Sequence, residues 1–166
     1  MPEVSGLRMI WLSAVIIVAD QLSKHWIVQN FVLFEPHPVL PVLDITRLHN
    51  TGAAFSFLAD AGGWQRWFFT TLAIAVSIAL VHWLRTLDGL RQKILTAGLA
   101  LVLGGAVGNV IDRVRFGHVV DFVHAHWNGA YFPAFNVADA AISVGAGLII
   151  LDAVLDAVRG TRKTQT

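Results

Sequence analysis

The sequence predicts an all-α membrane protein with four transmembrane helices and a small extracytoplasmic β-sheet. Hydrophobic residues make up 55% of the 166-residue chain and charged residues only 14%, whereas a soluble domain has about 25% charged residues. The apolar residues also form four long runs, each close to the roughly 20 residues that a helix needs to cross a bilayer. The length predicts a single integral-membrane domain over residues 1–166.

The four apolar runs differ in how many charges interrupt them. The expected spans are residues 7–28, 67–84, 94–111 and 137–158. The middle two carry no charged side chain, the first contains Arg8 near its start and Asp20 and Lys24 within it, and the last contains three aspartates. The first run has some features of a signal peptide, but no A-x-A cleavage pattern follows it, so we expect a retained helix.

The third run contains Gly104 and Gly108, which form a G-x-x-x-G pair. This spacing is typical of helices that pack closely in membranes. A phosphate-binding loop is disfavoured because no strand precedes the pair.

Two stretches between the runs predict strands. Residues 42–50 (VLDITRLHN) and 118–127 (HVVDFVHAHW) alternate, in part, between apolar and polar side chains. Asn128 and Gly129 follow the second stretch, and an Asn-Gly pair between such runs predicts a two-residue hairpin turn. The expected β regions are residues 38–58 and 117–135.

The distribution of lysine and arginine predicts cytoplasmic termini. In that orientation the short inner segments hold seven basic residues, which are Arg8, Arg85, Arg91, Lys93, Arg159, Arg162 and Lys163. The much longer outer segments hold five, which are Lys24, Arg47, Arg66, Arg113 and Arg115.

This topology brings nearly all the unusual polar residues to one level, near the outer membrane boundary. They are Asp20, Lys24, Asn50, Asn109, Asp112, Arg113, Asp121, Asn136 and Asp139. Ionisable groups within a membrane are costly and mark functional sites by default. The shared level therefore predicts one site on the outer side.

Several of these residues also have purely structural interpretations. Asp20 and Lys24 are four residues apart and can simply pair on one helix face. Asp112 and Arg113 can be ordinary charges at the membrane interface. Both interpretations stay open from the sequence alone.

Asn136 can be a helix N-cap, with Asp139 as the acid in the first turn. Asn50 can be a turn residue before Thr51 and Gly52. Asp121 has no such interpretation, because it lies between valines and a phenylalanine and is neither a cap nor a turn residue.

Two carboxyl groups that lie close together share a proton, and their pKa values separate. One can then accept a proton from water while the other donates one, which is the acid–base chemistry of amide hydrolysis without a metal. Asp121 and Asp139 are the candidate pair, and the expected substrate is a peptide bond near the membrane surface.

Five stretches give the chain a resemblance to lipoprotein signal peptidase (signal peptidase II), a family of bacterial inner-membrane aspartyl proteases. They occur in the family's order: DQLSK (20–24), NTGAAFSFL (50–58), GGAVGNVIDR (104–113), GHVVDF (117–122) and FPAFNVADAAI (132–142). Together they span almost the whole chain.

The resemblance implies removal of the signal peptide from diacylglyceryl-modified prolipoproteins, with cleavage before the lipidated cysteine. It implies that Asp121 and Asp139 are the catalytic pair. The residues expected to bind substrate or support the site are Asp20, Lys24, Asn50, Gly52, Asn109, Asp112, Arg113 and Asn136. It also implies a periplasmic β-cradle, a short helix at the membrane surface around residues 59–66, and inhibition by globomycin-type cyclic peptides.

We expect no cofactor and no metal. We also expect no nucleic-acid partner, since the net charge is +1 and the basic residues are scattered. We expect a monomer surrounded by membrane lipid.

Two other functions compete with this one. A metal-dependent hydrolase would use His118, His124 and His126 near Asp121, although no H-E-x-x-H pattern is present. A proton channel or transporter would need acids distributed across the membrane, whereas these acids cluster at one level.

Overall fold

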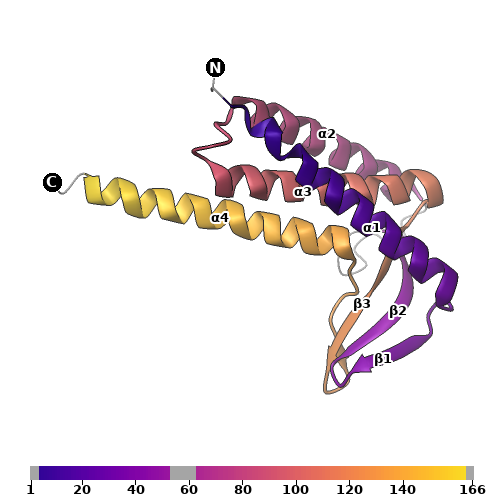
Figure 1. The fold of residues 1–166 in the computed structure, drawn as a ribbon. Coiled ribbons are helices and arrows are strands. Elements are labelled where there is room, and N and C mark those ends of the chain that lie inside the picture. Colours follow the sequence, from indigo (N-terminus) through magenta and orange to yellow (C-terminus); the bar gives the residue numbers. More distant parts are fainter. Residues whose placement is uncertain (1–3, 53–62, 164–166) are drawn as a thin grey trace.

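Four long helices dominate the computed structural model, which describes residues 4–52 and 63–163. The helices are α1 (Ile10–Asn30, extended by the 3-10 turn Gly6–Met9), α2 (Trp64–Thr86), α3 (Lys93–Phe116) and α4 (Val137–Lys163) (Figure 1). Each contains an apolar stretch long enough to cross a membrane. The four apolar helices and the small sheet described below confirm the predicted fold class.

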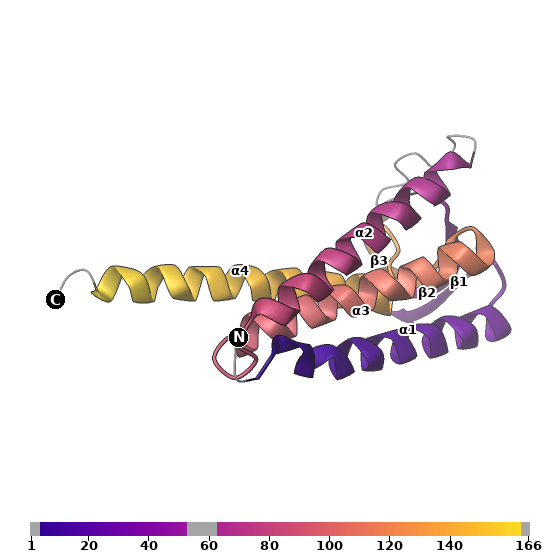
Figure 2. The ribbon, with the colours of Figure 1, turned by 90° about the horizontal axis from the view of Figure 1, so that it is seen from above.

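The centre of the bundle is α3. It packs against each of the other three helices, and Figure 2 shows it running between α1 and α2. Within the apolar stretch of α3, 61% of the residues are buried, compared with 17% for α1, 17% for α2 and 11% for α4. The outer helices therefore leave most of their apolar surface for lipid.

Glycines allow the helices to approach α3 this closely. A Cβ atom on Gly104 would lie 2.9 Å from the Ser13 carbonyl oxygen in α1. A Cβ atom on Gly98 would lie 2.8 Å from the Gly145 carbonyl oxygen in α4. A Cβ atom on Gly108 would lie 2.7 Å from Asp20 Oδ2 in α1, so the close packing predicted from Gly104 and Gly108 is confirmed.

A four-stranded antiparallel sheet lies beyond one end of the bundle (Figure 1). Its strands pair in the order β1 (Pro36–Leu40), β2 (Leu43–Asn50), β3 (Val119–Trp127) and β4 (Ala130–Tyr131). Asn128 and Gly129 join β3 to β4 with φ angles of 52° and 84°, so the predicted two-residue hairpin turn is confirmed.

A small apolar core ties the sheet to the bundle. Ile27, near the end of α1, packs with Val120 and Phe122 of β3, and all three side chains are buried. The direction of β3 is therefore set by its packing against α1, and β3 carries one of the candidate catalytic residues.

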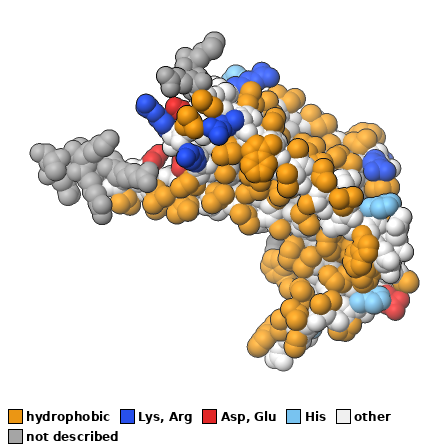
Figure 3. All heavy atoms as spheres, viewed as in Figure 1, with side chains coloured by type: hydrophobic (Ala, Val, Ile, Leu, Met, Phe, Trp, Pro, Cys, Tyr) orange, Lys and Arg blue, Asp and Glu red, His pale blue; other side chains and the backbone are white. Residues whose placement is uncertain are grey.

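Figure 3 shows apolar side chains over the length of the helices and much of the sheet. Basic side chains gather at the end of the bundle where α2 turns into α3. Trp11, Ile78 and Ile150 are examples of large apolar side chains with more than half of their surface exposed. Such a surface suits contact with lipid tails.

The helices differ in their bounds from the expected spans. In particular, α3 continues to Phe116, five residues beyond the expected end of its span at residue 111, and so includes Asp112 and Arg113. Residues 59–62, the first half of the short surface helix expected around residues 59–66, lie outside the described residues, and residues 64–66 begin α2.

Candidate active site

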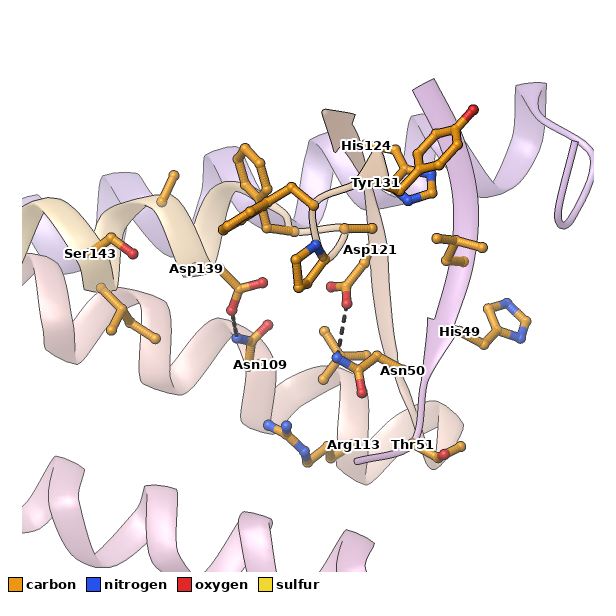
Figure 4. Close-up of a pocket in the computed structure, with 18 of the residues that line it drawn as sticks. His49, Asn50, Thr51, Asn109, Arg113, Asp121, His124, Tyr131, Asp139 and Ser143 are labelled. Carbon is orange, nitrogen blue, oxygen red and sulfur yellow. Dashed lines mark hydrogen bonds between the residues drawn. The ribbon is translucent and has the colours of Figure 1, made fainter. Parts of the chain in front are cut away.

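A cavity of about 1000 Å³ opens where α3, α4 and the sheet meet. Asp121 from β3 and Asp139 from α4 both point into it (Figure 4). Asn50, Asn109 and Arg113 also line this cavity. The structure therefore brings together, around one space, residues separated by up to 89 positions of sequence.

Two amide groups hold the Asp121 carboxyl group. The Asn136 Nδ2 atom donates a hydrogen bond of 2.7 Å to Oδ1, and the Asn50 Nδ2 atom donates one of 3.0 Å to Oδ2. Burial and the neighbouring Asp139 raise the pKa of Asp121 from 3.8 to about 7, although both amide contacts oppose this rise. Asp121 is therefore divided between its two protonation states near neutral pH.

Asp139 belongs to a capping box at the start of α4. Its backbone N–H donates to the Asn136 side-chain oxygen at 2.9 Å, and its own carboxylate accepts from the Asn136 N–H at 3.3 Å. Its second carboxylate oxygen accepts a 2.8 Å hydrogen bond from Asn109 Nδ2. The cap interpretation is thus correct, and it holds for a side chain that also faces the cavity.

Asn136 links the two acidic residues. Besides capping α4 at Asp139 and donating to Asp121, its Nδ2 atom lies 3.3 Å from the Val120 carbonyl oxygen and 3.3 Å from Asn109 Oδ1. Only 1% of its surface is exposed. One buried side chain therefore fixes the start of α4 relative to β3.

A buried ion cluster lies beside these amides. Lys24 Nζ is 2.8 Å from Asp20 Oδ2, 2.9 Å from Asp112 Oδ2 and 3.0 Å from Asn109 Oδ1. Asp20, Lys24 and Asp112 are almost completely buried. The Asp20–Lys24 pair foreseen on one helix face exists, but Asp112 is not an ordinary interfacial charge, because it is enclosed and paired with Lys24.

The loop after β2 brings Asn50 to Asp121. The Asn50 side-chain oxygen accepts a 3.0 Å hydrogen bond from the Gly52 N–H, which leaves its amide nitrogen facing the carboxyl group. The Gly52 carbonyl oxygen accepts a 3.3 Å hydrogen bond from Arg113 Nη2. Asn50 is therefore both a turn residue and a partner of Asp121, and Arg113 supports the turn.

Gln21 also belongs to this buried cluster, and the sequence interpretation missed it. Its side-chain amide donates to both Asp20 and Asp112. The signal was present in the helical spacing, because residue 21 lies three positions before Lys24 and so shares a face with it.

The three histidines of the metal hypothesis contact different side chains. His118 stacks on His49 at 3.7 Å between ring centroids, whereas His124 and His126 contact Tyr131 at 4.4 and 5.0 Å. Burial lowers the pKa of His49 to about 4. Within residues 4–52 and 63–163, no three His, Asp or Glu side chains are grouped to share a metal ion. The geometry of this part of the chain gives no support to the histidine-based metal hypothesis.

A family model for signal peptidase (SPase) II matches residues 12–155. The chain belongs to the signal peptidase II family. This family consists of membrane proteases, so the protein is an enzyme that hydrolyses peptide bonds. The family resemblance predicted from the five motifs is confirmed.

Curated relatives agree with this assignment. The chain is 53% identical over 150 residues to a lipoprotein signal peptidase of Shewanella woodyi, covering 90% of this chain and 85% of the relative. It is 54% identical over 148 residues to the lipoprotein signal peptidase of Shewanella pealeana, covering 89% and 86%.

Solved structures share the fold. One, described as a bacterial membrane enzyme solved by the in meso method at 2.3 Å resolution, superimposes with a TM-score of 0.80 at 33% identity. The match covers 90% of this signal peptidase and 89% of the other chain. A second, at 1.9 Å resolution, gives a TM-score of 0.73 at 32% identity over 87% and 90% of the two chains.

Proposed function

We propose that this signal peptidase II is an aspartyl endopeptidase that removes the signal peptide from diacylglyceryl-modified prolipoproteins, cleaving before the lipidated cysteine. One observation carries the proposal. Asp121 and Asp139 face one cavity, and the pKa of Asp121 is raised to about 7 by burial and by Asp139. The relatives named as lipoprotein signal peptidases support the substrate class.

In the proposed reaction the two carboxyl groups share one proton. The ionised group takes a proton from water while the water oxygen attacks the scissile carbonyl carbon, and the protonated group donates to the carbonyl oxygen. The resulting tetrahedral diol collapses when the C–N bond breaks. The carboxyl group that took the proton from water gives it to the leaving nitrogen, and one diol hydroxyl returns its proton to the other carboxylate as the new C=O bond forms. The amine and the new carboxyl terminus then depart, and the pair is back in its starting state.

The side chains that donate hydrogen bonds to the pair are neutral amides, which suits this reaction. Asn50 and Asn136 hold Asp121, and Asn109 holds Asp139. Each amide fixes an oxygen in place without adding a positive charge that would keep the carboxyl group permanently ionised. The proton can therefore pass between the acids and the substrate.

The cavity wall suits a lipidated peptide. Phe34, Phe132 and Val144 line the cavity, and each is more than half exposed. These apolar side chains can contact acyl chains while the peptide backbone lies between the two carboxyl groups. The same cavity would accept globomycin-type cyclic peptides, which we propose as inhibitors.

The test is cleavage of a lipidated prolipoprotein by the purified protein, with the same precursor without lipid as the comparison. We expect cleavage of the lipidated form before its modified cysteine, and full activity in EDTA because the carboxyl pair needs no metal. Activity that is lost in EDTA and restored by zinc would instead support the histidine hypothesis.

We propose a monomer in the bacterial inner membrane, with cytoplasmic termini and the cavity at the periplasmic face. The basic side chains at the end of the bundle opposite the sheet favour this orientation (Figure 3). The chain has no cysteine, so a single introduced cysteine reports the orientation of the protein directly. Asn128→Cys in the hairpin should react with an impermeant thiol reagent in intact spheroplasts.

The matched control for orientation is Leu90→Cys, at an exposed residue in the connection between α2 and α3. It should react only after lysis. The reverse pattern would show that the termini are periplasmic and would reject the proposed location of the cavity.

A further inference from the structure

We propose that Gln21 is a positioning residue that keeps Asp121 and Asp139 at the separation that proton sharing requires. The inference rests on the proposed function of these two carboxyl groups. Gln21 does not line the cavity, so its effect passes through the buried ion cluster of Asp20, Lys24 and Asp112.

The Gln21 side chain has a single arrangement that satisfies its surroundings. Its Nε2 atom lies 2.9 Å from Asp112 Oδ1, 3.2 Å from Asp20 Oδ2 and 3.3 Å from the Gly108 carbonyl oxygen. All three are acceptors, so a flipped amide would set its own oxygen against three oxygens. The amide nitrogen therefore joins α1 to two points on α3.

Besides their contacts with Lys24, both carboxylates that Gln21 holds also accept a backbone N–H group. The Asp20 Oδ1 atom accepts the Ala138 N–H at 2.9 Å, and the Asp112 Oδ2 atom accepts the Val120 N–H at 3.1 Å. Each of these N–H groups belongs to the residue immediately before one of the two cavity aspartates. Displacement of either carboxylate would move the backbone that carries a catalytic side chain.

Lys24 cannot supply this connection alone. Its ammonium group is already committed to Asp20 Oδ2, Asp112 Oδ2 and Asn109 Oδ1. The remaining oxygen of Asp112, Oδ1, is the one that Gln21 holds. Two buried carboxylates face one ammonium group, and Gln21 adds N–H donors to them without adding charge.

The experiment compares kcat and KM for a lipidated prolipoprotein across matched variants. Gln21→Glu keeps the side-chain shape but removes the N–H donors, and Gln21→Met removes them without introducing a charge. Gln29→Glu makes the same chemical change at an exposed residue of the same helix and is the control. Rates are normalised to folded protein measured by size-exclusion chromatography.

We expect both Gln21 variants to lower kcat by about tenfold or more, because they remove hydrogen bonds to charged groups. KM should stay within about threefold of the parent value, since the substrate contacts are unchanged. Gln29→Glu should match the parent.

Parental kcat in either Gln21 variant, or a higher KM with unchanged kcat, would overturn the positioning role. Asp121→Asn is included to separate this inference from the proposed function. If Asp121→Asn cleaves as well as the parent, or if the parent does not cleave, the proposed function fails and the positioning role fails with it.

Discussion

Two pairs of acids lie within one polar cluster, and they differ in the groups that face them. Asp20 and Asp112 share the Lys24 ammonium group at 2.8 and 2.9 Å. Asp121 and Asp139 accept side-chain hydrogen bonds from asparagine amides, at 2.7 to 3.0 Å. The first pair is closed off from solvent, whereas the second faces the cavity.

The difference explains how similar side chains serve different purposes. A cation beside a buried carboxylate offsets the cost of its charge and makes the pair a rigid structural link. Neutral amides orient a carboxyl group but leave much of that cost in place, so protonation stays accessible. The predictions below alter one pair at a time.

The largest effect is expected from removing titration at the cavity pair. Asp121→Asn and Asp139→Asn should each lower cleavage of lipidated prolipoprotein by at least about a thousandfold, because asparagine cannot accept and return the proton. The double variant should be no worse than either single variant, since the pair acts as one unit. The measurement is kcat for the purified proteins.

The Asp139 variant also separates catalysis from capping. Asparagine is a good N-terminal helix residue, so α4 should remain intact and the variant should still bind lipidated substrate. If capping were the only role of Asp139, this variant would cleave normally. Substantial cleavage would therefore remove Asp139 from the catalytic pair.

The next effect concerns the stability of the pair that faces Lys24. Lys24→Met should lower the free energy of unfolding by about 3–5 kcal/mol, because it leaves Asp20 and Asp112 buried without a cation. The measurement is thermal or denaturant unfolding in detergent.

Neutralising both acids in the Lys24→Met background tests the reason for that loss. Asp20→Asn and Asp112→Asn should recover much of the stability, because no buried charge then remains unpaired. An unchanged unfolding transition in Lys24→Met alone would show that the lysine is not the counter-charge of this pair.

The last prediction is a pH dependence of stability that comes from Asp121. The pKa of Asp121 is about 7 in the folded protein, compared with the ordinary value of 3.8. At pH values between these two, the protein therefore takes up a proton when it folds. The contribution of Asp121 to the free energy of unfolding is therefore highest below about pH 4 and falls as the pH rises to about 7. Asp121→Asn should abolish this fall. A parallel pH dependence in parent and variant would contradict the assignment.

The fold could largely be predicted from the sequence because its main determinants are local. Hydropathy marks the four spans, and the pair Asn128-Gly129 marks the hairpin. Hydropathy could not predict the central position of α3, since α3 and α4 have the same mean hydropathy of 2.0 but differ widely in burial. Packing against neighbouring helices, to which Gly104 and Gly105 contribute, distinguishes them.

Only part of the candidate site could be predicted from the sequence. Asn50 and Asp139 each have a local structural role and a contact across the fold, so local patterns alone do not separate the two. The enclosure of Asp112 and the bridging contacts of Gln21 depend on how α1 lies against α3. Such contacts join residues 88 and 91 positions apart, and a single sequence does not reveal them.

The width of the gap between the cavity carboxyl groups depends on an atom that is missing from α3. A Cβ atom on Gly105 would overlap the Ala138 carbonyl oxygen, one residue before Asp139. An added methyl group would push the first turn of α4 outward and carry the Asp139 carboxyl group away from Asp121. In the proposed reaction the two carboxyl groups act on a single water molecule and tolerate little extra distance, so the reach of the proposed proton relay is limited by a van der Waals contact between α3 and α4.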